Sequence, residues 1–140
     1  MSAEKNRVEA SRWLATGHED LTTAEILLQS GRHAHACFHS QQAGEKAMKA
    51  VWYTLGGDPW GHSVSRLITQ LKEIDISIFN AFKDQIEDAA RLDRDLVPTR
   101  YPNGLPDITP CQAFFAQDAV AAVGIAKILL ERAGVALGLT

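Results

Sequence analysis

The chain has 140 residues, of which 46% are hydrophobic and 22% charged, and its formal net charge is −3 at pH 7. These values are typical of a globular domain, so we expect residues 1–140 to form a single domain with its own core. The small acidic excess argues against a broad nucleic-acid or membrane surface, because such surfaces need a clear basic excess. It still allows one local basic pocket.

The sequence predicts neither a targeting segment nor a membrane span. The N-terminus is polar, and no apolar run approaches the roughly 20 residues that cross a bilayer. The two cysteines, Cys37 and Cys111, form no CxxC motif and are typical of free thiols in a reducing compartment. We therefore expect a cytoplasmic protein that has no contact with a membrane.

The first half of the chain predicts two long helices. From Ala10 onward, an apolar stripe at helical spacing indicates an amphipathic helix that ends at Ser30-Gly31. A second helix is predicted from Arg32 or His33 to Leu55, ahead of two glycines. Its expected packing side is rich in small residues, namely Ala36, Ser40, Ala43, Gly44, Ala47, Met48, Val51 and Leu55.

Three further helices are predicted in the second half. The third begins near His62-Ser63, and its apolar face comprises Val64, Leu67, Ile68 and Leu71. The fourth covers about Ile78 to Leu96, and the last runs from about Pro110 to about Ala133. Between these two, residues 98–110 contain four prolines and are expected to be irregular. The predicted fold is all-α: an antiparallel up-and-down four-helix bundle with an additional short helix, five helices in total.

The second helix also carries a polar row. This row comprises His35, His39, Gln42, Lys46, Lys49 and Tyr53, which follow one another at steps of three or four residues and therefore share one helix face. One interpretation is a solvated face on which Glu45 pairs with Lys49 at i, i+4. The other is an anion site, in which Gln42, Lys46 and Lys49 bind phosphate.

Several segments in this order resemble the HEPN family, the higher eukaryotes and prokaryotes nucleotide-binding domain. They are DLTTAEILL, HACFHSQQAGEKAMKAVWYTLG, GHSVSRLITQL and TRYPNG, followed by an alanine-rich last helix. The resemblance covers roughly Ala10 to Ala133. Its most specific parts are Gln42, Glu45-Lys46, Lys49, His62 and Arg100-Tyr101-Pro102.

The resemblance implies a helical bundle that often forms a homodimer. It also implies a role in nucleotide binding and, for stand-alone prokaryotic members, partnership with a minimal nucleotidyltransferase in modules that resemble toxin–antitoxin pairs. The predicted nucleotide or phosphate site comprises Gln42, Lys46, Lys49, His62, Arg100 and Tyr101. For Arg100-Tyr101-Pro102 two roles stay open: a phosphate clamp with a stacking tyrosine, or a purely architectural loop.

A large branch of the family consists of metal-independent RNases marked by Arg, four to six residues, then His near the last core helix. This chain departs from that pattern, because its last histidine is His62. The pairs Arg32 with His39 and His62 with Arg66 lie elsewhere, so we predict no catalytic residues. An atypical RNase that binds RNA, and a purely structural dimeric adaptor, remain the alternatives.

No metal or other cofactor is predicted. His35 and His39 have metal-ligand spacing but lack a third ligand on the same face. The carboxylates of the fourth helix, Asp84, Glu87, Asp88, Asp93 and Asp95, mix with arginines and are expected to form helix-face pairs. The three tryptophans are expected to fill the core or an interface.

Overall fold

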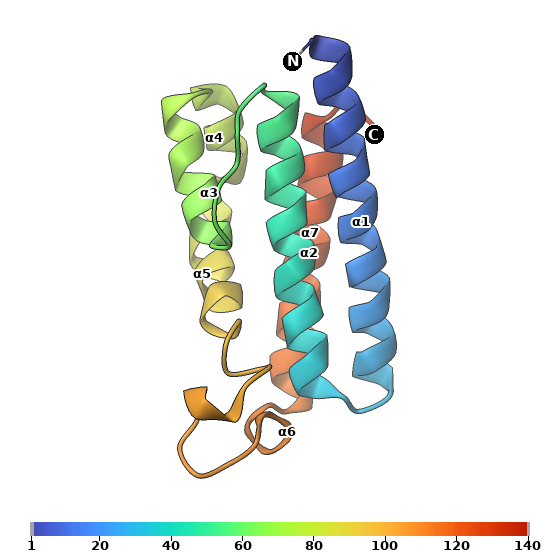
Figure 1. Ribbon diagram of the computed structural model, residues 1–140, viewed down its shortest axis with the longest axis vertical. Helices are drawn as coiled ribbons and strands as arrows, with labels where there is room; N and C mark the ends of the chain where they lie inside the picture. Colours follow the sequence, from blue (N-terminus) through green and yellow to red (C-terminus); the bar gives the residue numbers. More distant parts are fainter. Residues whose placement is uncertain (1, 140) are drawn as a thin grey trace.

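Three long helices, α1 (Ala3–Gln29), α2 (His33–Thr54) and α7 (Ala116–Ala136), lie side by side in the computed structural model, which describes residues 2–139 (Figure 1). A second group lies on the other side of α2 and contains α3 (Val64–Gln70), α4 (Ile76–Phe82) and α5 (Ile86–Arg94). Short 3₁₀ turns, η1 (Leu71–Glu73) and η2 (Lys83–Gln85), join these three helices. The described residues are helical and contain no strand, as the sequence predicted.

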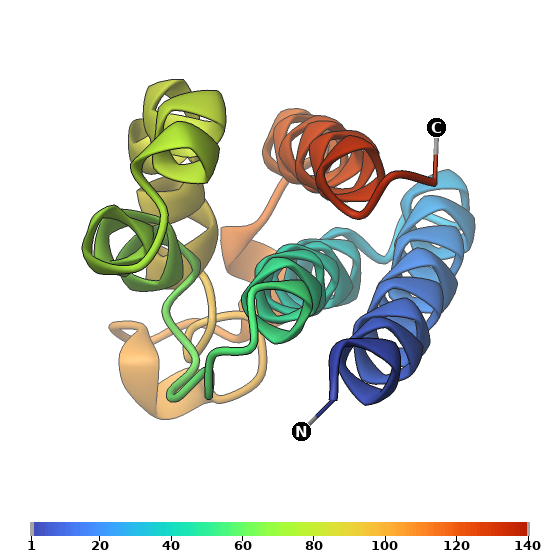
Figure 2. The same cartoon turned by 90° about the horizontal axis from the view of Figure 1, so that it is seen from above.

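Helix α2 is the central element, with neighbours on several sides (Figure 2). The small residues predicted for its packing side are buried, and Ala43, Ala47 and Met48 have no exposed surface. The predicted apolar stripe of α1 and the apolar face of α3 are buried as well. The sequence pattern therefore identified the inward faces correctly.

Two predicted helices are interrupted. The helix expected over Ile78–Leu96 is divided into α4 and α5 by η2, where Arg132 of α7 donates a hydrogen bond to the carbonyl oxygen of Ala81 at 3.1 Å. The helix expected from Pro110 to Ala133 is divided into α6 (Pro110–Ala113) and α7, because the backbone is extended at Phe114 and Phe115. The described chain thus has more helical segments than the five predicted.

The first helix also begins earlier than predicted, at Ala3, with Ser2 as its N-cap. Its polar first turns carry no apolar stripe, which is why the periodicity indicated a start near Ala10. Within residues 2–139, no helix combines the length and the apolar character that crossing a membrane requires.

Segment 55–63, called the returning segment below, controls the position of α3. It leaves the end of α2 and runs back beside that helix, so that α3 begins next to the middle of α2 (Figure 1). The carbonyl oxygen of His62 accepts a 2.9 Å hydrogen bond from the side-chain amide of Gln41, which is fully buried in α2. This bond ties the returning segment to α2.

Close approach of α1 to α2 depends on a glycine. A Cβ atom on Gly17 would lie 2.9 Å from Cδ2 of Leu130 and 3.3 Å from the backbone oxygen of Ala43. We predict that Gly17→Ala lowers the free energy of unfolding by about 1–3 kcal/mol. The reason is that the backbone oxygen of Ala43 cannot move away from the added methyl group as easily as the end of the Leu130 side chain can. Urea denaturation measures this change.

Gly124 of α7 is the matched control, since a Cβ there meets nothing within 4 Å. Gly124→Ala should raise the free energy of unfolding by about 0.5–1 kcal/mol through helix propensity alone. Equal effects at both positions would contradict the close approach of the two helices.

Candidate functional site

A hollow of about 330 Å³ lies between α2, the returning segment and the loop after α5. Its walls combine polar and apolar side chains, namely Phe38, Gln42, Glu45, His62, Leu96, Val97, Arg100 and Tyr101. Four of the six residues predicted as a nucleotide site, Gln42, His62, Arg100 and Tyr101, are therefore brought together. They come from three segments far apart in sequence, and the return of segment 55–63 along α2 makes this possible.

Arg100 lies against aromatic rings at this hollow. Its guanidinium carbon is 4.7 Å from the centre of the Phe38 ring and 5.3 Å from that of Tyr101. Among residues 2–139, the arginines that form ion pairs are Arg12, Arg91 and Arg132, so the charge of Arg100 has no carboxylate partner there. Stacking leaves the edge of a guanidinium, with its N–H donors, available to an anion.

Lys49 does not line the hollow. It forms the predicted i, i+4 pair with Glu45, at 3.0 Å between Nζ and Oε2, but this pair is not on a solvated face. Only 11% of the Lys49 side chain and 7% of the Glu45 side chain are exposed. The ammonium group also lies 5.4 Å from the centre of the Trp13 ring. Lys49 is therefore the counter-ion of a buried carboxylate.

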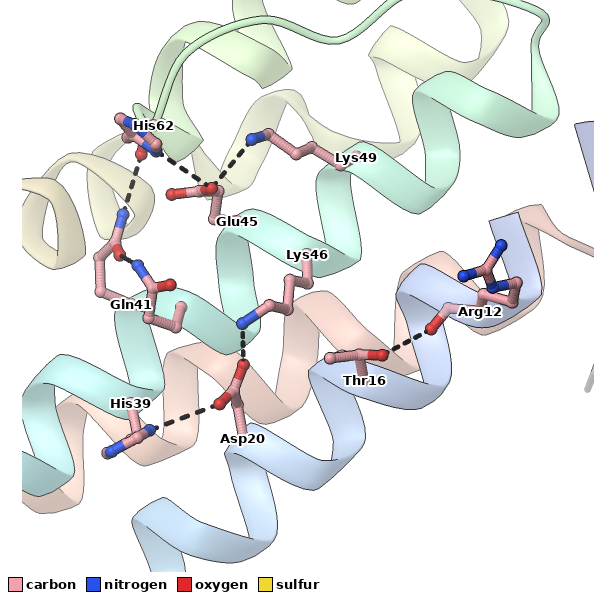
Figure 3. Close-up of polar contacts among 10 residues, drawn as sticks. Arg12, Thr16, Asp20, His39, Gln41, Glu45, Lys46, Lys49 and His62 are labelled. Atoms are coloured by element: carbon pink, nitrogen blue, oxygen red, sulfur yellow. Dashed lines mark hydrogen bonds and ion pairs between the residues drawn. The ribbon is translucent and has the colours of Figure 1, made fainter. Parts of the chain in front are cut away.

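Lys46 belongs to a different cluster, between α1 and α2. Its ammonium group binds the carboxylate of Asp20, whose other oxygen lies 3.4 Å from Nδ1 of His39 (Figure 3). Lys46 lines a separate hollow of about 240 Å³ with Glu9, Arg12, Trp13 and Thr16. The prediction of one pocket that contains both lysines is not what the structure shows, because each lysine is held by its own carboxylate.

His62 lies outside helix α3 instead of at its first turn. The N-cap is Ser63, and the first free N–H groups of α3 are already bonded: Asp93 accepts from Val64 at 2.8 Å and from Ser65 at 3.0 Å. These N–H groups are therefore not available to a bound anion, since Asp93 occupies them. His62 instead lies over Glu45, at 3.3 Å from Nδ1 to Oε2.

The sequence analysis missed Phe38, Gln41 and Asp20, and it missed the roles of Glu45 and Asp93 at the site; most of these residues are partners of those it found. Phe38, Glu45 and Gln41 lie in or beside the hollow, while Asp20 and Asp93 neutralise the neighbouring polar groups. Glu45 and Asp20 lie within the segments on which the family resemblance was based. Their roles depend on contacts at separations of 17 residues or more, such as Glu45 with His62, which local spacing does not reveal.

A further hollow, of about 280 Å³, lies between α5 and α7. It contains two arginines and two carboxylates, Arg91, Arg94, Asp95 and Asp118. Burial raises the pKa of Asp95, and the nearby Asp118 carboxylate raises it further, while the arginines oppose this effect. Because its charges balance, this hollow is a weaker candidate for binding an anion than the one at Arg100.

Most of the remaining sequence candidates have structural partners, and the exposed Trp60 is an exception. Asp84 forms a two-point ion pair with Arg132 of α7, which holds the pKa of that carboxyl below its usual value, and Asp88 pairs with Arg91. Within residues 2–139, no three His, Cys, Asp or Glu side chains are grouped as a metal site requires. Trp13 stacks on Tyr53, Trp52 donates to the carbonyl of Leu67, and Trp60 is 87% exposed.

Comparison with known proteins identifies the fold. The model of the HEPN domain family matches residues 10–135. The chain belongs to the HEPN family. No curated protein sequence matches it significantly.

Solved structures agree with this assignment. The structure of TT1696 from Thermus thermophilus superposes with a TM-score of 0.81 at 31% identity, over 91% of this chain and 97% of that one. ST0689, described as an archaeal HEPN homologue, gives a TM-score of 0.76 at 28% identity, over 91% and 97% of the two chains. An HEPN domain protein of Thermotoga maritima gives 0.70 at 28% identity, over 92% and 99%.

In this HEPN chain, neither Arg/His pair considered from the sequence forms a joint cluster. Arg32 is the exposed N-cap of α2, whereas His39 is held by Asp20 on the side facing α1. His62 contacts Glu45, and Arg66 is an exposed residue of α3 whose N–H group binds Ser63.

The buried Glu45–Lys49 pair gives a prediction about stability. Lys49→Ala leaves a carboxylate buried without its counter-ion, and we expect a loss of about 3 kcal/mol in the free energy of unfolding. Urea denaturation measures the loss, and Lys127→Ala on the exposed face of α7 is the control, with an expected change within about 0.5 kcal/mol. If the midpoints of both variants match the unmodified protein, the pair does not contribute as inferred.

Proposed function

We propose that this HEPN protein binds a nucleotide at the hollow beside α2, with Arg100 as the phosphate ligand. The observation that carries this proposal is the Arg100 guanidinium, which stacks on Phe38 and Tyr101 and has no carboxylate partner among residues 2–139. A planar guanidinium held in this way presents N–H donors in the geometry that phosphate accepts.

The size and lining of the hollow fit a small ligand better than a long polymer. Its volume of about 330 Å³ is in the lower part of the range of small-molecule sites. Phe38, Tyr101, Leu96 and Val97 supply apolar surface for a flat ring, and Gln42 supplies a polar group at the wall. The overall charge of −3 also disfavours an extended anionic partner.

Replacing Arg100 tests this function. Arg100→Ala removes a charge-assisted hydrogen bond worth about 1.5–3 kcal/mol, so nucleotide affinity should fall roughly tenfold to a hundredfold. Stability should hardly change, because the side chain is exposed. Calorimetric titration of ATP and GTP into the unmodified protein and the variant measures the effect.

Arg7→Ala is the matched control, since Arg7 is an exposed arginine of α1 that does not line this hollow. Absence of nucleotide binding at millimolar concentration would refute the proposed function. If Arg100→Ala unfolds the protein while the remaining folded fraction binds normally, Arg100-Tyr101-Pro102 is an architectural loop.

The proposal includes assembly as a homodimer and partnership with a nucleotidyltransferase, which the family resemblance implies. The small residues of α2 are buried against other helices of the same chain, so they do not supply a dimer interface. The exposed apolar side chains of α7, Val120, Ile128 and Val135, and the exposed Trp60 supply apolar surface instead.

Sedimentation at micromolar concentration tests the assembly. We expect a species of twice the 15.3 kDa chain mass. Val135→Glu should shift it toward the monomer, because a buried carboxylate at an apolar interface costs more than it does in water. A clean monomer for the unmodified protein would contradict the homodimer.

A further inference from the structure

One carboxylate oxygen in the hollow lacks a partner. Glu45 is 5% exposed, and its Oε2 atom is bonded to Lys49 at 3.0 Å and lies 3.3 Å from His62. Its Oε1 atom is buried and, among residues 2–139, has no hydrogen-bond donor. Figure 3 shows this oxygen on the side of the carboxylate that faces away from Lys49, toward Gln41. A buried acceptor in this state requires a donor to offset its desolvation.

A second acceptor is fixed by a relay of amides. The buried Gln41 must direct its NH₂ group to the carbonyl oxygen of His62, at 2.9 Å, because a carbonyl only accepts. Its own oxygen then faces Gln42, which must direct its NH₂ group to that oxygen, at 2.8 Å. The Gln42 oxygen therefore remains available as an acceptor, beside the second N–H of its NH₂ group, and this follows from the hydrogen-bond chain.

The hollow thus offers two acceptors, Glu45 Oε1 and the Gln42 oxygen, below aromatic and apolar walls. The His62 side chain, which contacts the other carboxylate oxygen at 3.3 Å, is 74% exposed and therefore free to change its rotamer. A ligand that satisfies both acceptors must carry two hydrogen-bond donors, and the aromatic and apolar walls favour a flat ring between them.

We propose that Glu45 and Gln42 select a guanine base, whose N1–H and 2-amino groups are two adjacent donors. This inference rests on the proposed nucleotide site and specifies its ligand. Adenine presents one amino group next to the lone pair of N1, and cytosine does the same with N3, so each would place a lone pair against one acceptor. Uracil has a single N–H group flanked by two carbonyl oxygens.

Titration of a series of triphosphates tests this selectivity. GTP should bind about tenfold or more tightly than ATP, CTP or UTP, which corresponds to one good pair of base contacts. ITP, which has N1–H but lacks the 2-amino group, should bind more weakly than GTP and more tightly than ATP. Gln42→Leu should lower the affinity for GTP about tenfold or more and leave that for ATP within about twofold.

Gln42→Leu leaves the Glu45–Lys49 pair in place, so a folded variant is expected, and circular dichroism verifies the fold. Gln29→Leu is the matched control, because Gln29 is exposed at the end of α1 and should leave all affinities unchanged. Glu45→Gln replaces the charged acceptor by an amide and should also reduce the ratio of GTP to ATP affinity.

The outcomes separate the two proposals. If GTP, ATP, CTP and UTP bind with similar affinity and only Arg100→Ala weakens them, the site binds phosphate, Glu45 Oε1 is satisfied by a water molecule, and the guanine inference is wrong. If GTP and ATP lose affinity equally in Gln42→Leu, the base is not read by this acceptor and the inference is also wrong. If no nucleotide binds, the proposed function itself has failed.

Discussion

The hydrogen bond from the Gln41 amide to the carbonyl of His62 holds the returning segment against α2, where that segment lines the candidate site. It ties segment 55–63 to the helix that the segment has just left, while Asp93 of α5 holds the next residues through Ser63 and Val64. A fully buried amide must find an acceptor, and in this structure the acceptor is backbone from the returning segment. The bond therefore serves two purposes at once: it satisfies a buried donor, and it places His62 beside Glu45 and the start of α3 beside the end of α5.

The fold was largely predictable because helical periodicity reports burial directly. Leu14, Leu21, Leu67 and Ile68 are buried as their spacing predicted. One of the two interruptions was not predictable from local sequence, because it depends on a distant residue. At Phe115 the contact is local, because its N–H group donates to the Asp118 carboxylate three positions on. The break between α4 and α5 instead coincides with a bond from Arg132, 51 positions away from Ala81. Local sequence does not indicate that a side chain from another helix donates a hydrogen bond to the Ala81 carbonyl oxygen.

The candidate site was predicted in part for the same reason. Spacing placed Gln42, Lys46 and Lys49 on one face of α2, and this is correct, but a helix face is wide enough to border two different neighbours. Lys46 meets Asp20 of α1, whereas Gln42 faces the returning segment and the loop that carries Arg100. The charge of a lysine is visible in a sequence, but its neutralisation by a carboxylate 26 positions away is not. Consequently Arg100 and His62 remain as potential cations of the hollow, and the two lysines act in support of the fold.

For the proposed nucleotide, the distribution of charge in the hollow favours one orientation. The Glu45 carboxylate lies at the buried side, where its remaining acceptor repels phosphate and favours N–H donors. Arg100 is exposed, where a phosphate keeps part of its hydration while it accepts from the guanidinium. Burying the phosphate at Glu45 would place two anions side by side in a region of low dielectric constant, and exposing the base would leave Oε1 without a donor. In the proposed complex, both costs are avoided only when the base lies inward and the phosphates lie at the rim.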